Sequence, residues 1–203
     1  PSIVGGFTNF ASPAVQDYNI ALAEEAAALG ADQVLVDDVR RPDGDATYMQ
    51  VPGRIGTNVE TLAGFLGRTQ QTVRAEGAYL GATVTSFSVQ DPTEYDQDLA
   101  AMGAVVDYLS PESFPESYSS GAFGVAEPQS DPGGTVEGAV NAAKEQLGDL
   151  ATPIVPWLQD YTFLQEDESF NKTFDVALHI GTLAAVVSYF RADLWRMLLG
   201  WFK

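Results

Sequence analysis

Residues 17–44 read D-Y-N-I-A-L-A-E-E-A-A-A-L-G-A-D-Q-V-L-V-D-D-V-R-R-P-D-G. Apolar side chains recur at helical spacing in the first half of this stretch, and Gly30 ends the pattern, as glycine often does after a helix. The run that follows is rich in valine and too short for a helix, which predicts a buried parallel strand over 33–37. A helix that leads directly into a buried strand is the repeating unit of α/β proteins.

The same alternation continues to about residue 160. A first helix is expected to begin at Ser12-Pro13, since serine is a favoured N-cap and proline suits the first turn. Further helices are expected over 58–75, 94–102 and 135–147, the last capped by Thr135, and further strands over 80–88, 104–110 and 153–159. This order predicts four parallel strands with right-handed crossovers, in either a doubly wound sheet or part of an eight-fold barrel. The strands are followed by no glycine-rich phosphate loop, which weakens the nucleotide-binding alternative.

The negative charge of the protein is concentrated in the first 170 residues. These residues include 26 acidic and 6 basic side chains, a net charge of −20, whereas residues 171–203 have a net charge of +2. An acidic body repels phosphate backbones, so no nucleic-acid partner is expected. The change of charge near residue 170 indicates that two different kinds of segment are joined in one chain.

The residue types present also narrow the chemistry. The chain has no cysteine, and His179 is its single histidine. This composition excludes thiolate and multi-histidine metal sites, and it excludes a Ser-His-Asp triad in the acidic part. We also expect neither a metal nor another cofactor, because hydrolysis carried out by carboxyl groups alone requires none. The chain begins at Pro1 without a methionine or a signal segment, which predicts a fragment or a processed product.

Three acidic residues are expected at the carboxyl ends of predicted strands, where barrel enzymes hold their active sites. Asp37, Glu112 and Asp160 are therefore the candidate catalytic residues. Glycoside hydrolysis needs two carboxyl groups, one that protonates the leaving oxygen and one that attacks the sugar or activates water. The adjacent Asp38 is expected instead to cap the next element or to pair with a neighbouring arginine, and Glu112 has the alternative of a solvated loop acid.

The predicted loop over 111–133 is long for a compact domain, and long loops are often functional. Its aromatic side chains, among them Tyr118 and Phe123, either stack against sugar rings or hold the loop against the barrel. Carbohydrate is the expected partner, and the candidate substrate contacts are Arg40, Tyr118 and Trp157.

Motifs over about 150 residues resemble a bacterial family of glycoside hydrolase-type barrels. In residues 17–44 the pattern follows the family's strand ending F-D-Y-V-R-F-P, with Asp37, Arg40 and Pro42 in matching positions. In residues 107–118 it follows I-S-P-M-x-Y-P-S-H-Y, although Glu112 stands where methionine is usual and a serine stands where histidine is usual. P-W-L-Q-D-Y-T at 156–162 follows the family's P-W-L-Q-D-F. The resemblance implies a barrel fold and a glycosidase reaction class, with no cofactor.

Residues 168–203 resemble a different family, the undecaprenyl-diphosphate phosphatases, through the stretch F-D-V-A-L-H-I-G-T-L. The acidic pair and the Ser-Ser-Thr-Gly-His stretch of that family are missing, and His179 has no catalytic role by this match. Val176 to Phe190 has no charged residue, so membrane association through residues 174–202 is expected, with an outer barrel helix as the alternative.

Together these observations predict an α/β fold: a partial (β/α) TIM-type barrel with about four parallel strands over residues 1–165, then a hydrophobic helical segment over 166–203. The expected function is glycoside hydrolysis by a carboxylate pair. The alternatives are an integral membrane phosphatase fragment acting on a polyprenyl diphosphate, and a carbohydrate-binding module without turnover. The barrel part is expected outside the cell or at its surface, and the C-terminal segment in the membrane if it inserts. With about four strands, two sheet edges stay open, so we expect little turnover from this chain.

Overall fold

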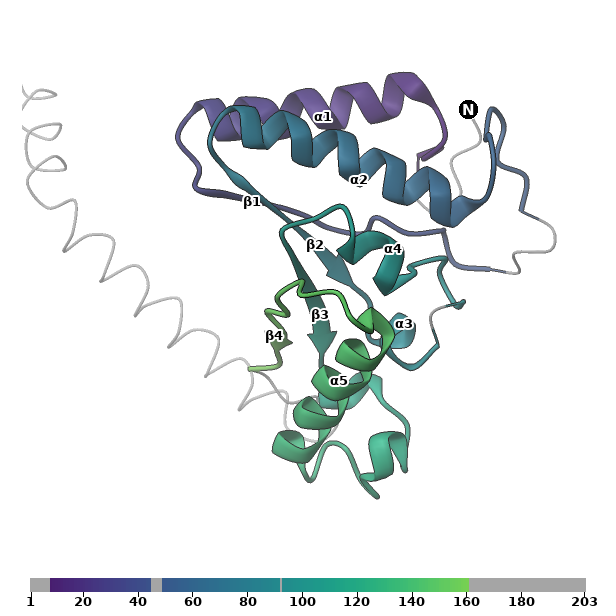
Figure 1. The fold of residues 1–203 in the computed structure, drawn as a ribbon. Helices are drawn as coiled ribbons and strands as arrows, with labels where there is room; N and C mark the ends of the chain where they lie inside the picture. Colours follow the sequence, from purple (N-terminus) through teal and green to yellow (C-terminus); the bar gives the residue numbers. More distant parts are fainter. Residues whose placement is uncertain (1–7, 45–48, 92, 161–203) are drawn as a thin grey trace, which may run out of the picture. The chain divides into compact units, whose positions relative to one another are not determined.

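The computed structural model describes residues 8–44, 49–91 and 93–160, which belong to one compact unit ending at Asp160. Helices and strands alternate along this unit (Figure 1). The predicted hydrophobic segment over 166–203, and with it the predicted membrane association, lies outside the described residues. Within the described ranges, no helix is both long enough and apolar enough to cross a membrane.

Four parallel strands form the sheet in chain order. They are β1 (Gln33–Val36), β2 (Tyr79–Val84), β3 (Tyr108–Ser113) and β4 (Trp157–Leu158). β1 pairs with β2, β2 with β3, and β3 with β4, and each pairing is parallel. The prediction of four adjacent parallel strands in chain order is therefore confirmed. Sequential parallel pairing of this kind is the arrangement of half a (β/α) barrel.

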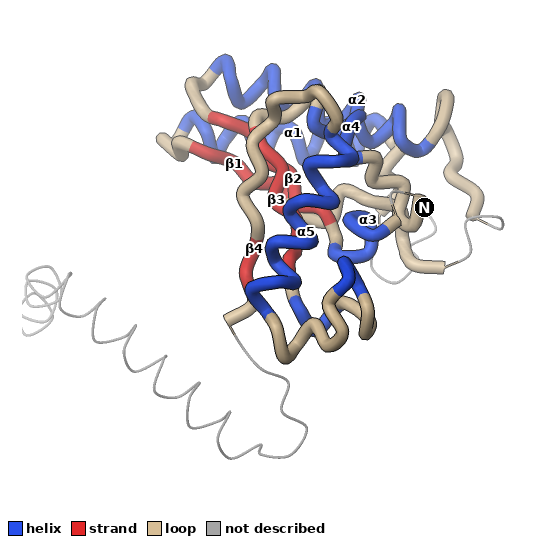
Figure 2. The backbone as a smooth tube through the Cα atoms, turned by 60° about the horizontal axis from the view of Figure 1, so that its bottom comes forward, coloured by secondary structure: helices blue, strands red, loops and turns tan. Residues whose placement is uncertain are grey.

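The helices lie on one side of this sheet (Figure 2). They are α1 (Pro13–Ala28), α2 (Asn58–Ala75), α3 (Ser86–Gln90), α4 (Leu99–Gly103) and α5 (Pro132–Leu147), with short 3-10 turns η2 (Pro115–Ser117) and η3 (Ala122–Gly124). α2 has the predicted bounds, because Thr57 and Glu60 form a reciprocal capping box at its start. Alternate strand residues point toward the helices and form one apolar core with them. From the strands, this core includes Val34, Val36, Leu80, Ala82, Val84 and Leu109.

The end of one predicted strand and the start of one predicted helix differ from the expectation, because side-chain caps set the helix starts. The strand expected over 80–88 ends at Val84, since the Thr85 side chain accepts a hydrogen bond from the Ser88 N–H and starts α3. The last helix begins at Pro132 rather than at Thr135. Its N-cap is Asp131, whose carboxylate accepts a hydrogen bond from the Gly134 N–H, and proline suits the first turn.

The third and fourth strands also differ from the expectation. The strand expected over 104–110 is instead β3, Tyr108–Ser113, because residues after α4 first form a turn in which the Val105 N–H donates to the Met102 carbonyl. Glu112 consequently lies inside this strand and not in a loop after it. The strand expected over 153–159 is reduced to β4, Trp157–Leu158, preceded by an isolated bridge between Leu109 and Ile154.

The face of the sheet away from the helices, here called the polar face, carries polar side chains toward its carboxyl-terminal edge. Since side chains alternate along a strand, Thr83 of β2 and Ser110 and Glu112 of β3 share this face. Gly81 also belongs to it, and a side chain at Gly81 would collide with the ring of Tyr108. In a closed barrel, this is the face that lines the interior.

Candidate active site

The carboxyl-terminal edge of the sheet brings the predicted acidic residues to one end of the unit. Asp37 follows β1 directly, Glu112 is the penultimate residue of β3, and Asp160 lies two residues beyond β4. Because all four strands are parallel, these positions share one edge, together with the loop that follows β3. This is the edge at which barrel enzymes hold their active sites.

Asp37 is held in place by the neighbouring strand. Its carboxylate oxygen Oδ1 accepts a hydrogen bond from the Thr83 hydroxyl at 2.5 Å and another from the Asp38 N–H at 2.9 Å. Asp38 has a φ of 53°, in the left-handed region, which aspartate tolerates better than most residues. Thr83 is buried, whereas Asp37 remains exposed to solvent. The side chain is thus oriented by the sheet and open to a ligand.

Glu112 is half-buried and has few donors to stabilise its charge. Burial raises the pKa of its carboxyl, a hydrogen bond from the Ser86 backbone lowers it, and the negative charges of Asp37 and Asp38 raise it again. The net effect is a raised pKa. A carboxyl group with a raised pKa keeps its proton to higher pH, which suits a general acid.

Arg40 is engaged with acidic residues of its own loop. Its guanidinium pairs with Asp38 at 2.8 Å and with Asp43 at 3.0 Å, and it lies over the ring of Tyr95 at 4.6 Å. The expected alternative, in which Asp38 forms an ion pair with a neighbouring arginine, is thus realised with Arg40. The Arg40 side chain is 13% exposed, so it has limited surface for a substrate.

Two buried polar residues that hold this edge together were not among the sequence candidates. Arg41 is 5% exposed and fastens the loop after β1 to the loop before α4. Its guanidinium contacts Asp96 at 3.1 Å and donates to the carbonyls of Gly44 and Glu94. An arginine beside prolines and aspartates gives no distinctive pattern, so its burial could not be predicted.

Gln97 is fully buried and connects three segments at the edge. Its amide nitrogen donates to the carbonyls of Val39 and Thr83, and its amide oxygen accepts from the Thr85 N–H and the Ser88 hydroxyl. All four contacts are between 3.0 and 3.2 Å long. Gln97 therefore fixes the ends of β1 and β2 relative to α3.

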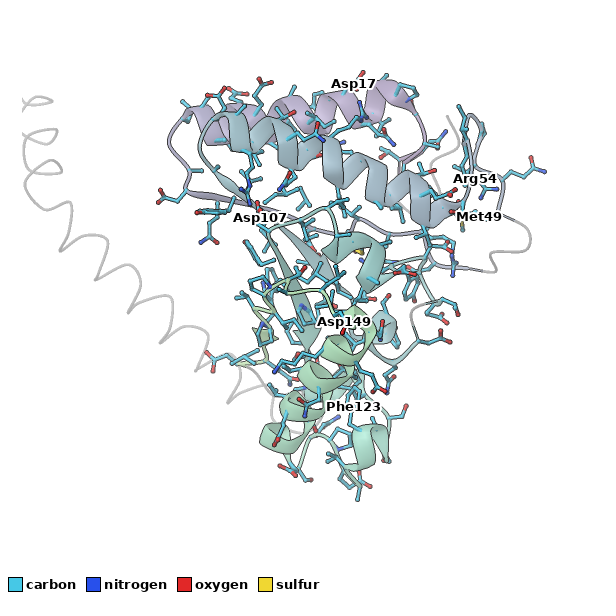
Figure 3. All side chains as sticks on the ribbon, viewed as in Figure 1. Asp17, Met49, Arg54, Asp107, Phe123 and Asp149 are labelled. Carbon is cyan, nitrogen blue, oxygen red and sulfur yellow. The ribbon has the colours of Figure 1, made fainter. Side chains whose placement is uncertain are left out.

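Tyr118 differs from its expected role as a substrate contact. It is 5% exposed, and its ring packs edge-on against Phe123 at 4.9 Å. Figure 3 shows Phe123 toward the lower end of the unit, whereas Asp107, which precedes β3, lies higher up. A buried ring has no open face for a sugar. Tyr118 therefore fits the alternative expectation, in which aromatic side chains hold the long loop against the barrel. Its hydroxyl instead donates to the Glu112 carbonyl at 3.1 Å.

Trp157 and Asp160 are exposed at the last strand. Trp157 is 42% exposed and is the ladder partner of Glu112, which puts its indole ring in reach of a ligand at that residue. Within the described ranges, Asp160 forms no hydrogen bond or ion pair with Asp37 or Glu112. The same ranges contain no group of three or more His, Asp or Glu side chains that could hold a metal ion.

A cavity of about 410 Å³ adjoins Asp37 on the helix side of β1. Its wall is formed mainly by apolar side chains of α1, β1 and α2, and Asp37, Asp38 and Arg40 line it as well. The cavity and the polar face of the sheet thus meet at Asp37.

A family model matches most of the chain. Residues 4–183 match the family described as "Putative glycosyl hydrolase domain". The chain belongs to this family. The first resemblance seen in the sequence is thereby confirmed, and the match extends past residue 165, where the sequence alone suggested the end of the barrel part. That boundary stays a prediction, since it lies outside the described residues.

The second resemblance is confirmed by short matches to curated proteins. The chain is 63% identical over 30 residues to an undecaprenyl-diphosphatase of Hahella chejuensis and 59% identical over 29 residues to one of Saccharophagus degradans. These matches span 15% and 14% of this chain and 11% of the length of each relative.

Among solved structures, a chitinase from Chromobacterium violaceum is similar, with a TM-score of 0.48 and 21% identity over 76% of this chain and 46% of the chitinase.

Proposed function

We propose that the carboxyl-terminal edge of the sheet is a glycoside hydrolase site with Glu112 as the general acid. The observation that supports this most directly is the raised pKa of Glu112, caused by burial and by the charges of Asp37 and Asp38. A protonated Glu112 donates its proton to the glycosidic oxygen as the bond to the sugar breaks. The membership of the chain in a glycosyl hydrolase family supports carbohydrate as the substrate.

Asp37 is the proposed second carboxylate, as nucleophile or as the base that activates water. Its orientation by Thr83 and its exposure to solvent suit either role. Asp160 is a further candidate for this role, from the last described strand. Trp157 is the proposed stacking surface for a sugar ring, since its exposed indole is paired across the ladder with Glu112. Arg40 contributes by holding Asp38 and by facing the same edge.

The test compares two kinds of glycoside, because the need for an acid depends on the leaving group. Since slow turnover is expected from residues 1–203, the assay uses aryl glycosides with good leaving groups beside unactivated oligosaccharides. Glu112→Gln should slow cleavage of the oligosaccharides by about 100-fold or more and slow that of the aryl glycosides far less. Asp37→Asn should slow both. Equal losses on both substrates for Glu112→Gln would contradict its role as the acid.

Two exposed residues on α5 and just beyond it provide matched controls. Glu145→Gln and Asp149→Asn make the same chemical changes at exposed residues outside the proposed site and should leave all rates unchanged. Oligosaccharide binding without turnover of any glycoside would favour the alternative of a non-catalytic carbohydrate-binding module. The location of the barrel part outside the cell or at its surface is proposed with this function and is tested by fractionating the producing cells.

A second candidate function is motivated by the short matches to undecaprenyl-diphosphatases. Because those matches span 11% of each relative, hydrolysis of a polyprenyl diphosphate by this chain is a separate proposal. It is tested by measuring phosphate release from such a substrate in detergent. Release that persists in Glu112→Gln and Asp37→Asn would require a site outside the sheet edge.

A further inference from the structure

We infer that Ser86 and Tyr118 are positioning residues that hold the proposed acid, Glu112, by its backbone and its side chain together. This inference rests on the proposed function for its catalytic meaning. The contacts themselves are independent of any substrate, so they can be tested separately. Neither residue needs to touch a sugar for this role, and both are nearly inaccessible, with Ser86 1% and Tyr118 5% exposed.

The two hydroxyl groups converge on one atom. The Ser86 hydroxyl donates to the Glu112 carbonyl oxygen at 2.6 Å, and the Tyr118 hydroxyl donates to the same oxygen at 3.1 Å. A carbonyl oxygen has two lone pairs and can accept both bonds. Most backbone carbonyls in a sheet accept one bond from the adjacent strand, so two side-chain donors on one carbonyl are a local device that fixes this residue.

Ser86 also contacts the other end of Glu112. A hydrogen bond from its backbone acts on the Glu112 carboxyl and lowers the pKa, against the effects of burial and of Asp37 and Asp38. Because Ser86 is the first residue of α3, its N–H has no acceptor within that helix. One residue thus holds the carbonyl through its hydroxyl and the carboxylate through its N–H.

Tyr118 extends the contact to the long loop after β3. Its ring packs against Phe123 of η3, and its hydroxyl reaches back to Glu112. The conformation of this loop is thereby coupled to the position of Glu112. Small displacements matter in catalysis, since an error of about 1 Å in a reacting group can cost on the order of 100-fold in rate.

The first test measures the titration of Glu112 directly, by NMR on isotopically labelled protein of residues 1–203 without ligand. In the unmodified protein, the Ser86 amide signal should shift with pH at the same midpoint as the Glu112 carboxyl carbon. In Ser86→Ala and Tyr118→Phe, the carbonyl loses a donor and the strand end moves away from the Ser86 N–H. The pKa of Glu112 should then rise above its value in the unmodified protein, because the Ser86 donor is weakened while burial and the charges of Asp37, Asp38 and Arg40 remain.

Ser88→Ala is the matched control. Ser88 is a buried serine of the same short helix, but its hydroxyl contacts Gln97 and Thr85 and not Glu112. It should lower thermal stability much as Ser86→Ala does and leave the Glu112 titration unchanged. An equal shift in Ser88→Ala, or no shift in either test variant, would overturn the inference. If the variants do not fold, the unmodified protein still provides a test. A Ser86 amide signal that does not shift at the pH midpoint of Glu112 would overturn the inference as well.

The second test concerns rate. On an unactivated oligosaccharide, Ser86→Ala and Tyr118→Phe should each lower kcat by about 10- to 100-fold with little change in KM, since binding surfaces are untouched. The double variant should lose little more than either single variant, because both act on one carbonyl. If no glycoside is cleaved by any form, the proposed function fails, while the NMR measurements still decide whether the contact exists.

Discussion

The two ends of β3 each have an acidic residue, and their surroundings have opposite effects. Asp107 precedes the strand at the amino-terminal edge, and its side chain is 6% exposed. Its carboxylate pairs with Arg74 and accepts hydrogen bonds from Gln70 at 3.2 Å and from the Leu80 N–H at 2.8 Å. Burial raises the pKa of Asp107, but these donors outweigh it and the net pKa is lowered. At the other edge, the pKa of Glu112 is raised.

The difference teaches which carboxylate is available for chemistry. Three partners stabilise the charge of Asp107, so it remains ionised and serves the fold by joining α2 to β2 and β3. Glu112 has the Ser86 backbone as a donor and faces the negative charges of Asp37 and Asp38. Glu112 therefore keeps its proton to a higher pH than an ordinary glutamate, whereas Asp107 loses its proton at a lower pH than an ordinary aspartate. Burial alone does not separate the two residues, since the number of donors around each one decides its role.

The largest effect on stability is expected from Asp107→Ala. It leaves the buried Leu80 N–H without an acceptor and removes the bond to Gln70, which should cost about 2–3 kcal/mol in the free energy of unfolding. The ion pair with the half-exposed Arg74 adds little to this. The measurement is urea unfolding at pH 7, with the exposed Asp149→Ala as control. A loss no greater than that of the control would remove the contrast between the two edges.

The pH dependence of that loss follows from the lowered pKa of Asp107. The stability contributed by Asp107 is present above its unfolded pKa of about 3.9 and is lost as pH falls through the lower folded pKa. The part of the difference between Asp107→Ala and the unmodified protein that depends on charge should therefore shrink in acid. A difference that stays constant down to the acid limit of folding would indicate packing rather than charge.

A smaller effect is expected from Gly81→Ala, which tests the packing of the polar face between the two edges. The added methyl would meet the ring of Tyr108, and moving a half-buried ring should cost about 1 kcal/mol. The control is Gly64→Ala in α2, where no atom lies within 4 Å of the added methyl and the helix should gain about 0.5–1 kcal/mol. Thermal unfolding measures both. If Gly81→Ala were as harmless as Gly64→Ala, Tyr108 would not pack on β2 as described.

The smallest change in stability is expected from Glu112→Gln, and its sign is opposite to that of Asp107→Ala. Because the folded pKa of Glu112 is raised, its ionisation destabilises the fold as pH increases from the unfolded pKa of about 4.3 through the higher folded pKa. Glutamine does not titrate, so the variant should gain stability relative to the unmodified protein over this range and keep that gain above it. Unfolding curves between pH 3 and 8 measure the difference. A loss of stability that grows with pH would show that the Glu112 charge is favourable.

Local patterns in the sequence were sufficient for the order and direction of the strands. The run 33–37 is apolar and short, the helix over 58–75 has its capping box in the sequence, and connections of this length permit parallel pairing. Asp37 could be identified because it is the last residue of such a run. These features depend on near neighbours in the chain, which is why they can be read without the fold.

What only the tertiary structure decided concerns contacts between distant segments. Glu112 lies within β3 and not after it, because the strand begins four residues later than its valines suggest. Tyr118 is buried beneath Phe123, and Arg41 and Gln97 hold separate loops through carbonyls that any residue could provide. The sequence by itself determined a parallel α/β architecture and a set of acidic candidates. The surroundings of each carboxylate, and thus whether it holds a charge or a proton, depend on donors brought from other strands and helices, and those meet only in the folded chain.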